Sequence, residues 1–133
     1  TLSIIEALLV NIGDDIFAIP LNSVKEIMEI SYDDVKILDG HRVLNYKNKI
    51  IPLIDLNEKL GIDTIENKDK DLYIVVVQKG DNLSAFSINR LIGQKEIVIK
   101  SLGKYLSGVK IASGATILGD GKVALILDIN RLA

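Results

Sequence analysis

The chain contains one pattern twice, and this repeat constrains its fold more than any single residue does. The segment Leu8–Ala18 aligns with Val75–Ala85, 67 positions later, and the two share a Val, a Gly, an Asp and an Ala at matching positions. A second segment, Lys49–Asn57, aligns with Lys122–Asn130 at an offset of 73 and retains its Lys, Asp and Asn between apolar positions. Two segments that recur in the same order indicate two copies of one small unit.

The length of each copy predicts that the two copies pack on each other. A unit of about 60 residues buries only about 60% of its surface, so its own core is marginal. We therefore expect one domain over residues 1–133, with approximate halves at 4–62 and 71–133 and a connector at 63–70. This arrangement allows strands to exchange between the halves. The chain begins with Thr1 rather than Met, which suggests a piece of a longer protein.

Alternating apolar residues around Gly, Asp and Asn turns predict four β-hairpins. Their strand pairs are Leu8–Ile12 with Ile16–Ile19, Arg42–Tyr46 with Lys49–Ile54, Tyr73–Val77 with Leu83–Ile88, and Ala115–Leu118 with Val123–Leu127. Two short helices are expected, at Leu21–Met28 after Pro20 and at Asp55–Leu60 before Gly61. The pattern favours an all-β fold of two five-stranded barrels packed on each other, with short helices.

Two strands have apolar residues at consecutive positions instead of alternate ones. They are Ile74–Val77 and Leu125–Leu127. We expect both faces of these strands to be covered, one by the interior of a barrel and the other by the sister barrel.

Composition excludes several classes of function. The chain has no Cys, which rules out a disulfide framework and zinc fingers and fits a reducing cytoplasm. Its 16 basic and 18 acidic residues give a net charge of −2, and only 5% of residues are aromatic. A nucleic-acid-binding pair of small barrels would need a basic groove with stacking rings, so no nucleic acid is expected as a partner. The apolar runs are too short to insert into a membrane.

Catalytic, cofactor and metal sites are not expected. Gly114 to Lys122 contains glycines and a lysine, but Asp120 follows Gly119 where a phosphate-binding loop needs Lys. This segment is typical of a β-turn instead. His41 follows Asp39-Gly40 in a turn, without the acidic or metal-binding neighbours that acid–base chemistry requires.

Three further segments resemble a known family. They are Phe17–Pro20 with the preceding Ala7–Val10, Leu91–Gly103, and Gly114–Gly121, which reads Gly-Ala-Thr-Ile-Leu-Gly-Asp-Gly. Together they resemble the CheW-like regulatory domain at the C-terminus of the bacterial chemotaxis histidine kinase CheA. The resemblance covers nearly the whole chain and implies two SH3-like barrels.

The resemblance implies a non-catalytic docking and regulatory domain in a two-component system. Its expected partners are a CheW-type adapter, the cytoplasmic tip of chemoreceptors, and the other domains of the parent kinase. The expected location is the cytoplasm, at the inner face of the membrane through receptor complexes. The alternative within the same fold is a stand-alone CheW-type adapter.

Two segments are candidates for docking a partner. The first is the turn Lys47-Asn48. The family often carries Arg-Gly-Glu here, and this chain has Lys47-Asn48-Lys49. Asn suits the turn conformation, and the change from Glu to Lys reverses a surface charge.

The second segment follows from the two repeat offsets, which place about six additional residues in the second half. We assign them to Lys100–Ser113, a segment that either folds back on its own barrel or presents an apolar ridge. The docking candidates there are Leu102, Tyr105, Leu106, Val109 and Ile111.

Overall fold

The computed structural model describes residues 3–61, 71–101 and 112–129. Within these residues the fold is almost entirely β-structure, as the sequence predicts. The strands are β1 (Ser3–Ile12), β2 (Asp15–Pro20), β3 (Val24–Ile30), β4 (Val35–Leu38), β5 (His41–Tyr46), β6 (Lys49–Asp55), β7 (Leu72–Lys79), β8 (Asn82–Ile88), β9 (Arg90–Ser101), β10 (Ala112–Ile117) and β11 (Val123–Leu127). The helical turns are η1 (Leu21–Ser23), η2 (Tyr32–Asp34) and α1 (Leu56–Lys59).

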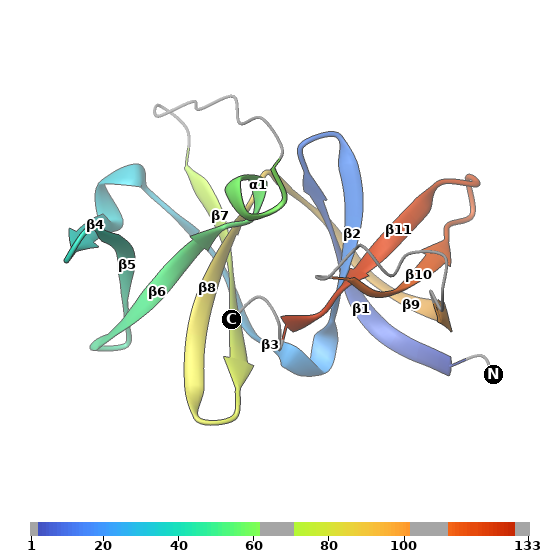
Figure 1. Cartoon of the computed structure of the whole chain (residues 1–133), viewed down its shortest axis with the longest axis horizontal. Helices are drawn as coiled ribbons and strands as arrows, with labels where there is room; N and C mark the ends of the chain where they lie inside the picture. The colour runs from blue at the N-terminus through green and yellow to red at the C-terminus, as the bar shows by residue number, and fades with distance from the viewer. Residues whose placement is uncertain (1–2, 62–70, 102–111, 130–133) are drawn as a thin grey trace.

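The strands form two sheets that lie side by side (Figure 1). The first is a closed barrel in the order β1-β2-β11-β10-β9, and we call it the closed barrel. The second, which we call the six-stranded sheet, has the order β3-β7-β8-β6-β5-β4. It has one strand more than the expected five because η2 separates β3 from β4. Ser31 starts η2 by accepting a hydrogen bond from the Asp33 amide at 3.2 Å.

Each sheet contains strands from both halves of the sequence. Strand β11 from the second half pairs in parallel with β2, and β6 from the first half pairs in parallel with β8. The remaining pairings are antiparallel. Neither half therefore completes a sheet without the other.

The repeat is visible in the irregularities as well as in the strands. The pairing of β3 with β7 shifts between Val24 and Glu26, which leaves Lys25 as an extra residue. The pairing of β9 with β1 shifts in the same way around Ile92. These two bulges are separated by the same 67 positions as the repeated hairpins, which shows that β3 and β9 are equivalent strands.

The four predicted hairpins are confirmed by the pairs β1–β2, β5–β6, β7–β8 and β10–β11. The turn between β5 and β6 has positive φ at Lys47 (49°) and Asn48 (67°), as a two-residue hairpin turn requires. The corresponding turn between β10 and β11 has three residues, Gly119–Gly121, closed by the Leu118 amide, which donates to the Lys122 carbonyl at 2.8 Å.

One of the two predicted helices is wrong. Within residues 21–28, only Leu21–Ser23 are helical, as the short turn η1. Strand β3 already begins at Val24. Val24 and Ile27 pack against the apolar cluster between the sheets, and β3 pairs along β7, so tertiary contacts outweigh the local helix signal. The other helix is confirmed as α1, where Asp55 caps the start and Gly61 follows with a φ of 69°.

Buried side chains form three clusters. The central cluster lies between the two sheets, because it combines residues of β1, β2 and β11 with residues of β7, β8 and α1. Along β7, Val75 and Val77 belong to the central cluster, whereas Ile74 and Val76 belong to the interior of the six-stranded sheet. On β11, Leu127 faces the central cluster and Ile126 faces the interior of the closed barrel. The prediction that both faces of these strands are covered is therefore confirmed.

The central cluster generates the first prediction. Leu127→Ala removes a side chain that is 1% exposed and should lower the free energy of unfolding by about 2–5 kcal/mol, since it leaves a cavity between the sheets. Val123→Ala, in the same strand but 58% exposed, should cost less than about 1 kcal/mol. Urea denaturation of the two variants measures both values, and equal losses would contradict the packing described here.

Candidate docking surfaces

The six-stranded sheet exposes apolar side chains on one face of its outer hairpins. Within β5, Leu44 and Tyr46 are buried, so Val43 points to the opposite face. The β4–β5 and β5–β6 registers place Leu38, Ile50 and Pro52 on this same outward face. Leu38 is 55% exposed and Ile50 is 58% exposed. We call these four residues the first apolar face.

The closed barrel has a second exposed apolar region beside its β10–β11 hairpin. Ile117 pairs with Val123, and Ile117 is 75% exposed. Strands β9 and β10 pair only at Lys100–Ser101 with Gly114–Ala115 and then diverge. The space between them is a groove of about 500 Å³, lined by Val98, Ile117 and Val123 among others. We call these three residues the second apolar face.

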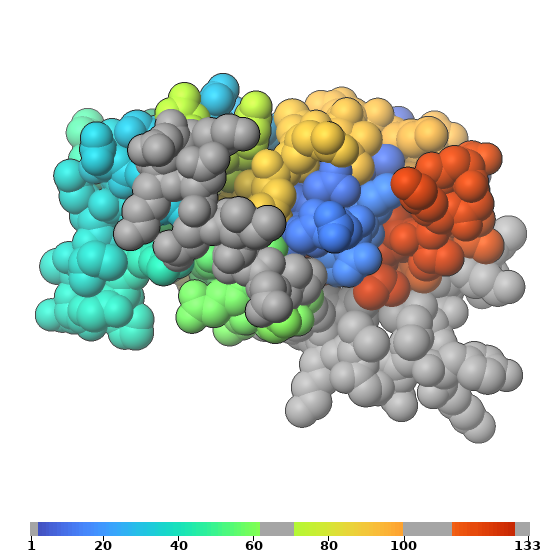
Figure 2. Space-filling view, turned by 90° about the horizontal axis from the view of Figure 1, so that it is seen from above, coloured from blue at the N-terminus to red at the C-terminus, as the bar shows by residue number. Residues whose placement is uncertain are grey.

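The two apolar faces lie on equivalent hairpins and share one equivalent position in the repeat. Ile50 in β6 corresponds to Val123 in β11 at the offset of 73, and each is 58% exposed. Strands β4 and β5 lie at one end of the long axis of the molecule, and β10 and β11 lie at the other (Figure 1). Figure 2 shows the same separation from above, with β1 and β2 in blue between the two ends. The molecule therefore presents two related surfaces that point in different directions.

The turn Lys47-Asn48 lies next to the first apolar face and is held by contacts within the molecule. The Tyr46 hydroxyl donates a hydrogen bond to Glu26 Oε1 at 3.1 Å. Lys47 Nζ lies 3.6 Å from the same carboxylate oxygen and 5.3 Å from the centre of the Tyr46 ring. Because Tyr46 belongs to β5 and Glu26 to β3, these contacts connect β3, at one edge of the six-stranded sheet, with β5, the strand next to the other edge. We call these three residues the Tyr46 latch.

The Tyr46 latch changes the protonation of its lysine. The neighbouring Tyr46 hydroxyl, followed by the Glu26 carboxylate, raises the pKa of Lys47 above its ordinary value. The ammonium group of Lys47 thus makes an intramolecular contact at the exposed surface. A contact of Lys47 or Asn48 with a partner stays a prediction.

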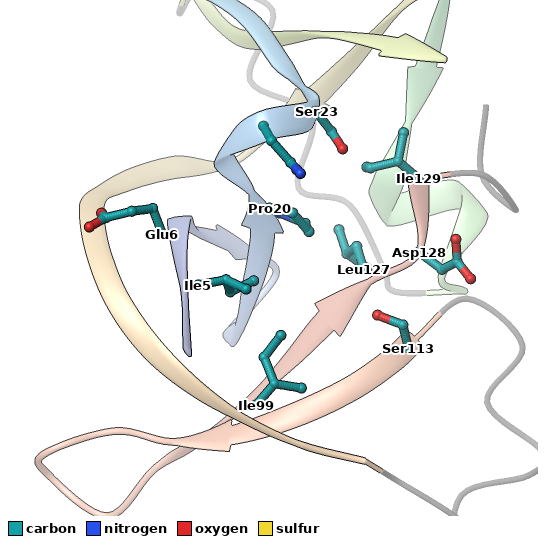
Figure 3. A pocket seen from close by; sticks show the side chains of 10 residues that line it. Ile5, Glu6, Pro20, Ser23, Ile99, Ser113, Leu127, Asp128 and Ile129 are labelled. Atoms are coloured by element: carbon teal, nitrogen blue, oxygen red, sulfur yellow. The ribbon is translucent and has the colours of Figure 1, made fainter. Parts of the chain in front are cut away.

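A second hollow lies where the chain passes from the closed barrel to the six-stranded sheet (Figure 3). It has a volume of about 530 Å³. Figure 3 shows Ile5, Pro20, Ile99 and Leu127 around it, from β1, β2, β9 and β11, while the carboxylate of Glu6 points away from them. Its lining is mixed apolar and polar, and it offers no set of groups that converge on a reacting atom.

Among residues 3–61, 71–101 and 112–129, no group of three His, Asp or Glu side chains could hold a metal ion. His41 lies exposed at the start of β5, opposite Leu38. The glycine-containing segment after Gly114 is the hairpin β10–β11, as the sequence predicts. No helix in the described part of the chain is long and apolar enough to cross a membrane.

The docking candidates of the sequence divide into two groups. Lys47 and Asn48 are placed at the β5–β6 turn. The other five lie outside the described residues; they are Leu102, Tyr105, Leu106, Val109 and Ile111. The sequence pattern does not identify Ile50 and Val123 as docking candidates, because both belong to runs of consecutive apolar residues that do not show which positions are exposed. The repeat itself was the available signal, because it aligns these two residues.

Comparisons with known proteins agree with the resemblance found in the sequence. The family model described as "CheW-like domain" matches residues 6–133. The chain is 44% identical to the chemotaxis protein CheA of Bacillus subtilis over 99% of its length, and 40% identical to the sensor histidine kinase CheAY of Helicobacter pylori over 99%. It spans only 20% and 16% of these two relatives.

A solved structure supports the fold. The fold is similar to the crystal structure of the scaffolding protein TtCheW from Thermoanaerobacter tengcongensis, with a TM-score of 0.76 at 18% sequence identity. The superposition covers 95% of this chain and 90% of the TtCheW chain. The all-β fold predicted from the sequence is confirmed by this similarity.

The Tyr46 latch generates the second prediction. Tyr46→Phe keeps the ring but removes the hydrogen bond to Glu26, and it should lower the free energy of unfolding by about 0.5–1.5 kcal/mol. It should also lower the pKa of Lys47 toward its ordinary value, which NMR titration of the Lys47 side chain measures.

The raised pKa also sets the pH at which Lys47 contributes to stability. A raised pKa means that this contribution is complete below the ordinary value of 10.5 and disappears as the pH rises through the value in the folded state. Glu26→Gln should lower the pKa in the same direction, whereas Glu29→Gln, on the same strand and exposed, should leave it unchanged. An unchanged pKa in Tyr46→Phe would contradict the latch.

Proposed function

Because the chain belongs to the CheW-like domain family, we propose that it is the docking and regulatory domain of a chemotaxis histidine kinase. A CheW-like domain is a docking fold and not an enzyme, in agreement with the expectation from the sequence. The observation that carries the proposal is the pair of equivalent apolar faces at opposite ends of the molecule. Isolated exposed apolar residues are common, but clusters on two equivalent hairpins, with Ile50 and Val123 at the matching position, support two contact sites.

The geometry favours a repeated contact with another two-unit domain. A surface on one barrel that binds the opposite barrel of a neighbour forms a heterologous interface, and such interfaces build rings or extended assemblies. The proposed partner at both faces is a CheW-type adapter. Each face combines exposed apolar residues with charged neighbours: Lys36 pairs with Val43 on the first face, and Lys95 and Glu96 line the groove of the second. Mixed apolar and polar surface of this kind occurs at protein–protein interfaces.

Further partners follow from the family and complete the proposal. They are the cytoplasmic tip of a chemoreceptor and the other domains of the parent kinase, which place the domain in the cytoplasm near the inner face of the membrane. Signal would reach the kinase as a change in packing between domains, since chemistry within these residues is not expected. The candidates Leu102, Tyr105, Leu106, Val109 and Ile111 belong to the same proposal as additional docking residues.

The two apolar faces generate the third prediction. Ile50→Glu and Val123→Glu each put a charge without a partner into a proposed contact, and each should weaken binding to the purified adapter about tenfold or more, since such a contact loses more than about 1.4 kcal/mol. Isothermal titration calorimetry measures the affinity. Thermal unfolding should change little because both side chains are mostly exposed.

Asn82→Glu is the matched control for these variants. Asn82 is exposed at the β7–β8 turn, outside both apolar faces, and the substitution adds the same charge. It should leave the affinity unchanged. Unaltered binding in both Ile50→Glu and Val123→Glu would remove the support for the proposed docking faces.

A further inference from the structure

The two halves of the molecule differ at two pairs of equivalent positions. Ile27 pairs with Val75, and Gln94 pairs with Leu8, while Leu8 and Val75 are themselves equivalent. Glu26 therefore corresponds to Gly93, the preceding position on each strand. Tyr46 and Leu118 correspond as well, because each is the last residue before its hairpin turn.

In the six-stranded sheet, the gap between Glu26 on β3 and the end of β5 is filled by a side chain. The Tyr46 side chain is 4% exposed and spans the gap between β5 and β3. The cation of Lys47 lies over the Tyr46 ring, and the carboxylate of Glu26 accepts a hydrogen bond from the Tyr46 hydroxyl. The first half of the chain thus shows which chemistry fits the gap between these strands.

In the closed barrel the equivalent position is an open groove of about 430 Å³. Leu118 stands in place of the tyrosine, and Gly93 stands in place of the glutamate. A Cβ atom added at Gly93 would meet no atom within 4 Å, and the same holds at Gly119. The space that the Tyr46 latch fills in one half is left free in the other.

The walls of this groove combine apolar and charged groups. Leu9, Ile16 and Leu118 provide apolar surface, and Lys95 and Asp120 provide one charge of each sign. Lys95 is two residues from Gly93 and so lies on the same face of β9. This lysine and this carboxylate repeat the pair of charges that surrounds Tyr46. The groove also shares Lys95, Leu118 and Gly119 with the groove of the second apolar face, so the two are continuous.

We propose that the groove between Gly93 and Leu118 binds an aromatic side chain, tyrosine in particular, presented by the docking partner. The inference rests on the proposed docking function and names what one of its contacts recognises. Lys95 contacts the face of the ring, as Lys47 does for Tyr46, and Asp120 accepts the phenolic hydrogen bond, as Glu26 does. Buried aromatic anchors of this kind commonly dominate protein–protein contacts.

The test uses the full-length protein and three small probes, the N-acetyl amides of tyrosine, phenylalanine and leucine. Saturation-transfer NMR reports which probe binds. We expect the tyrosine amide to bind about threefold to fivefold more strongly than the leucine amide, as a cation–π contact at an exposed site would give. Equal binding of the tyrosine and leucine amides would overturn the inference.

Two variants locate the site. Leu118→Tyr puts a ring into the groove from within, as Tyr46 does in the other half, and should abolish binding of the tyrosine amide and weaken binding of the adapter. Leu118→Met, the matched control, keeps an apolar side chain of similar size and should retain both. In Asp120→Asn the remaining oxygen can still accept from the Lys122 amide, so the turn should be kept. The second carboxylate oxygen is replaced by an NH2 group, which cannot accept the phenolic hydrogen bond, so the preference for tyrosine over phenylalanine should be lost.

The outcomes separate this inference from the proposed function. If adapter binding responds to Ile50→Glu but not to Leu118→Tyr, docking stands and the aromatic site is wrong. If the adapter does not bind the full-length protein, the docking proposal fails, and the probes alone decide whether the groove binds a ring. If circular dichroism shows that Leu118→Tyr is unfolded, Asp120→Asn tests the aromatic site instead. Loss of its preference for tyrosine over phenylalanine supports the site, and an unchanged preference overturns it.

Discussion

The central cluster between the two sheets is the contact on which the rest of the structure depends. It gathers side chains from five strands and α1, including Leu8, Val10, Val75, Val77 and Leu127, and it buries them almost completely. A unit of about 60 residues cannot bury enough apolar surface alone, so the shared cluster provides what each half lacks. Because β1 and β7 send alternate residues to this cluster and to their own interiors, the cluster also fixes the register of both strands.

The sequence predicts those parts of the fold whose signal is local or repeated. Gly13-Asp14, Lys47-Asn48, Gly80-Asp81 and Gly119–Gly121 each identify a turn, and all four hairpins exist. The helix expected at Leu21–Met28 fails because most of this segment forms a strand with a bulge, in which Lys25 shifts the alternation by one residue. Local patterns cannot show the β-bulge, which depends on pairing with the distant strand β7.

The docking surfaces are harder to predict than the fold. Consecutive apolar residues occur in both β6 and β7, and in β7 all of Ile74–Val77 are buried while in β6 Ile50 is exposed. The difference arises from position. One face of β7 lies in the central cluster and the other in the interior of the six-stranded sheet, whereas β6 extends away from the closed barrel toward one end of the molecule (Figure 1). Only the three-dimensional arrangement shows which apolar residues lack a neighbour.

Equivalent backbone positions in the two halves carry side chains with different structural roles. In the first half, Tyr46 and Glu26 join β5 to β3, which η2 separates from β4. In the second half, β9 runs unbroken from β1 to β10, and the barrel is closed by backbone pairing. The residues that correspond to Tyr46 and Glu26 are therefore released from a structural role there.

The exchange of strands between halves also governs how the protein can be made. The ribosome releases β1 and β2 first, but the barrel they belong to needs β11, which is synthesised more than 100 residues later. Contacts between such distant segments form slowly because a long loop must close before they contribute. The nascent chain consequently carries an open strand edge on β2 until nearly all of the domain has emerged, and chaperones that shield such edges would act on it during this interval.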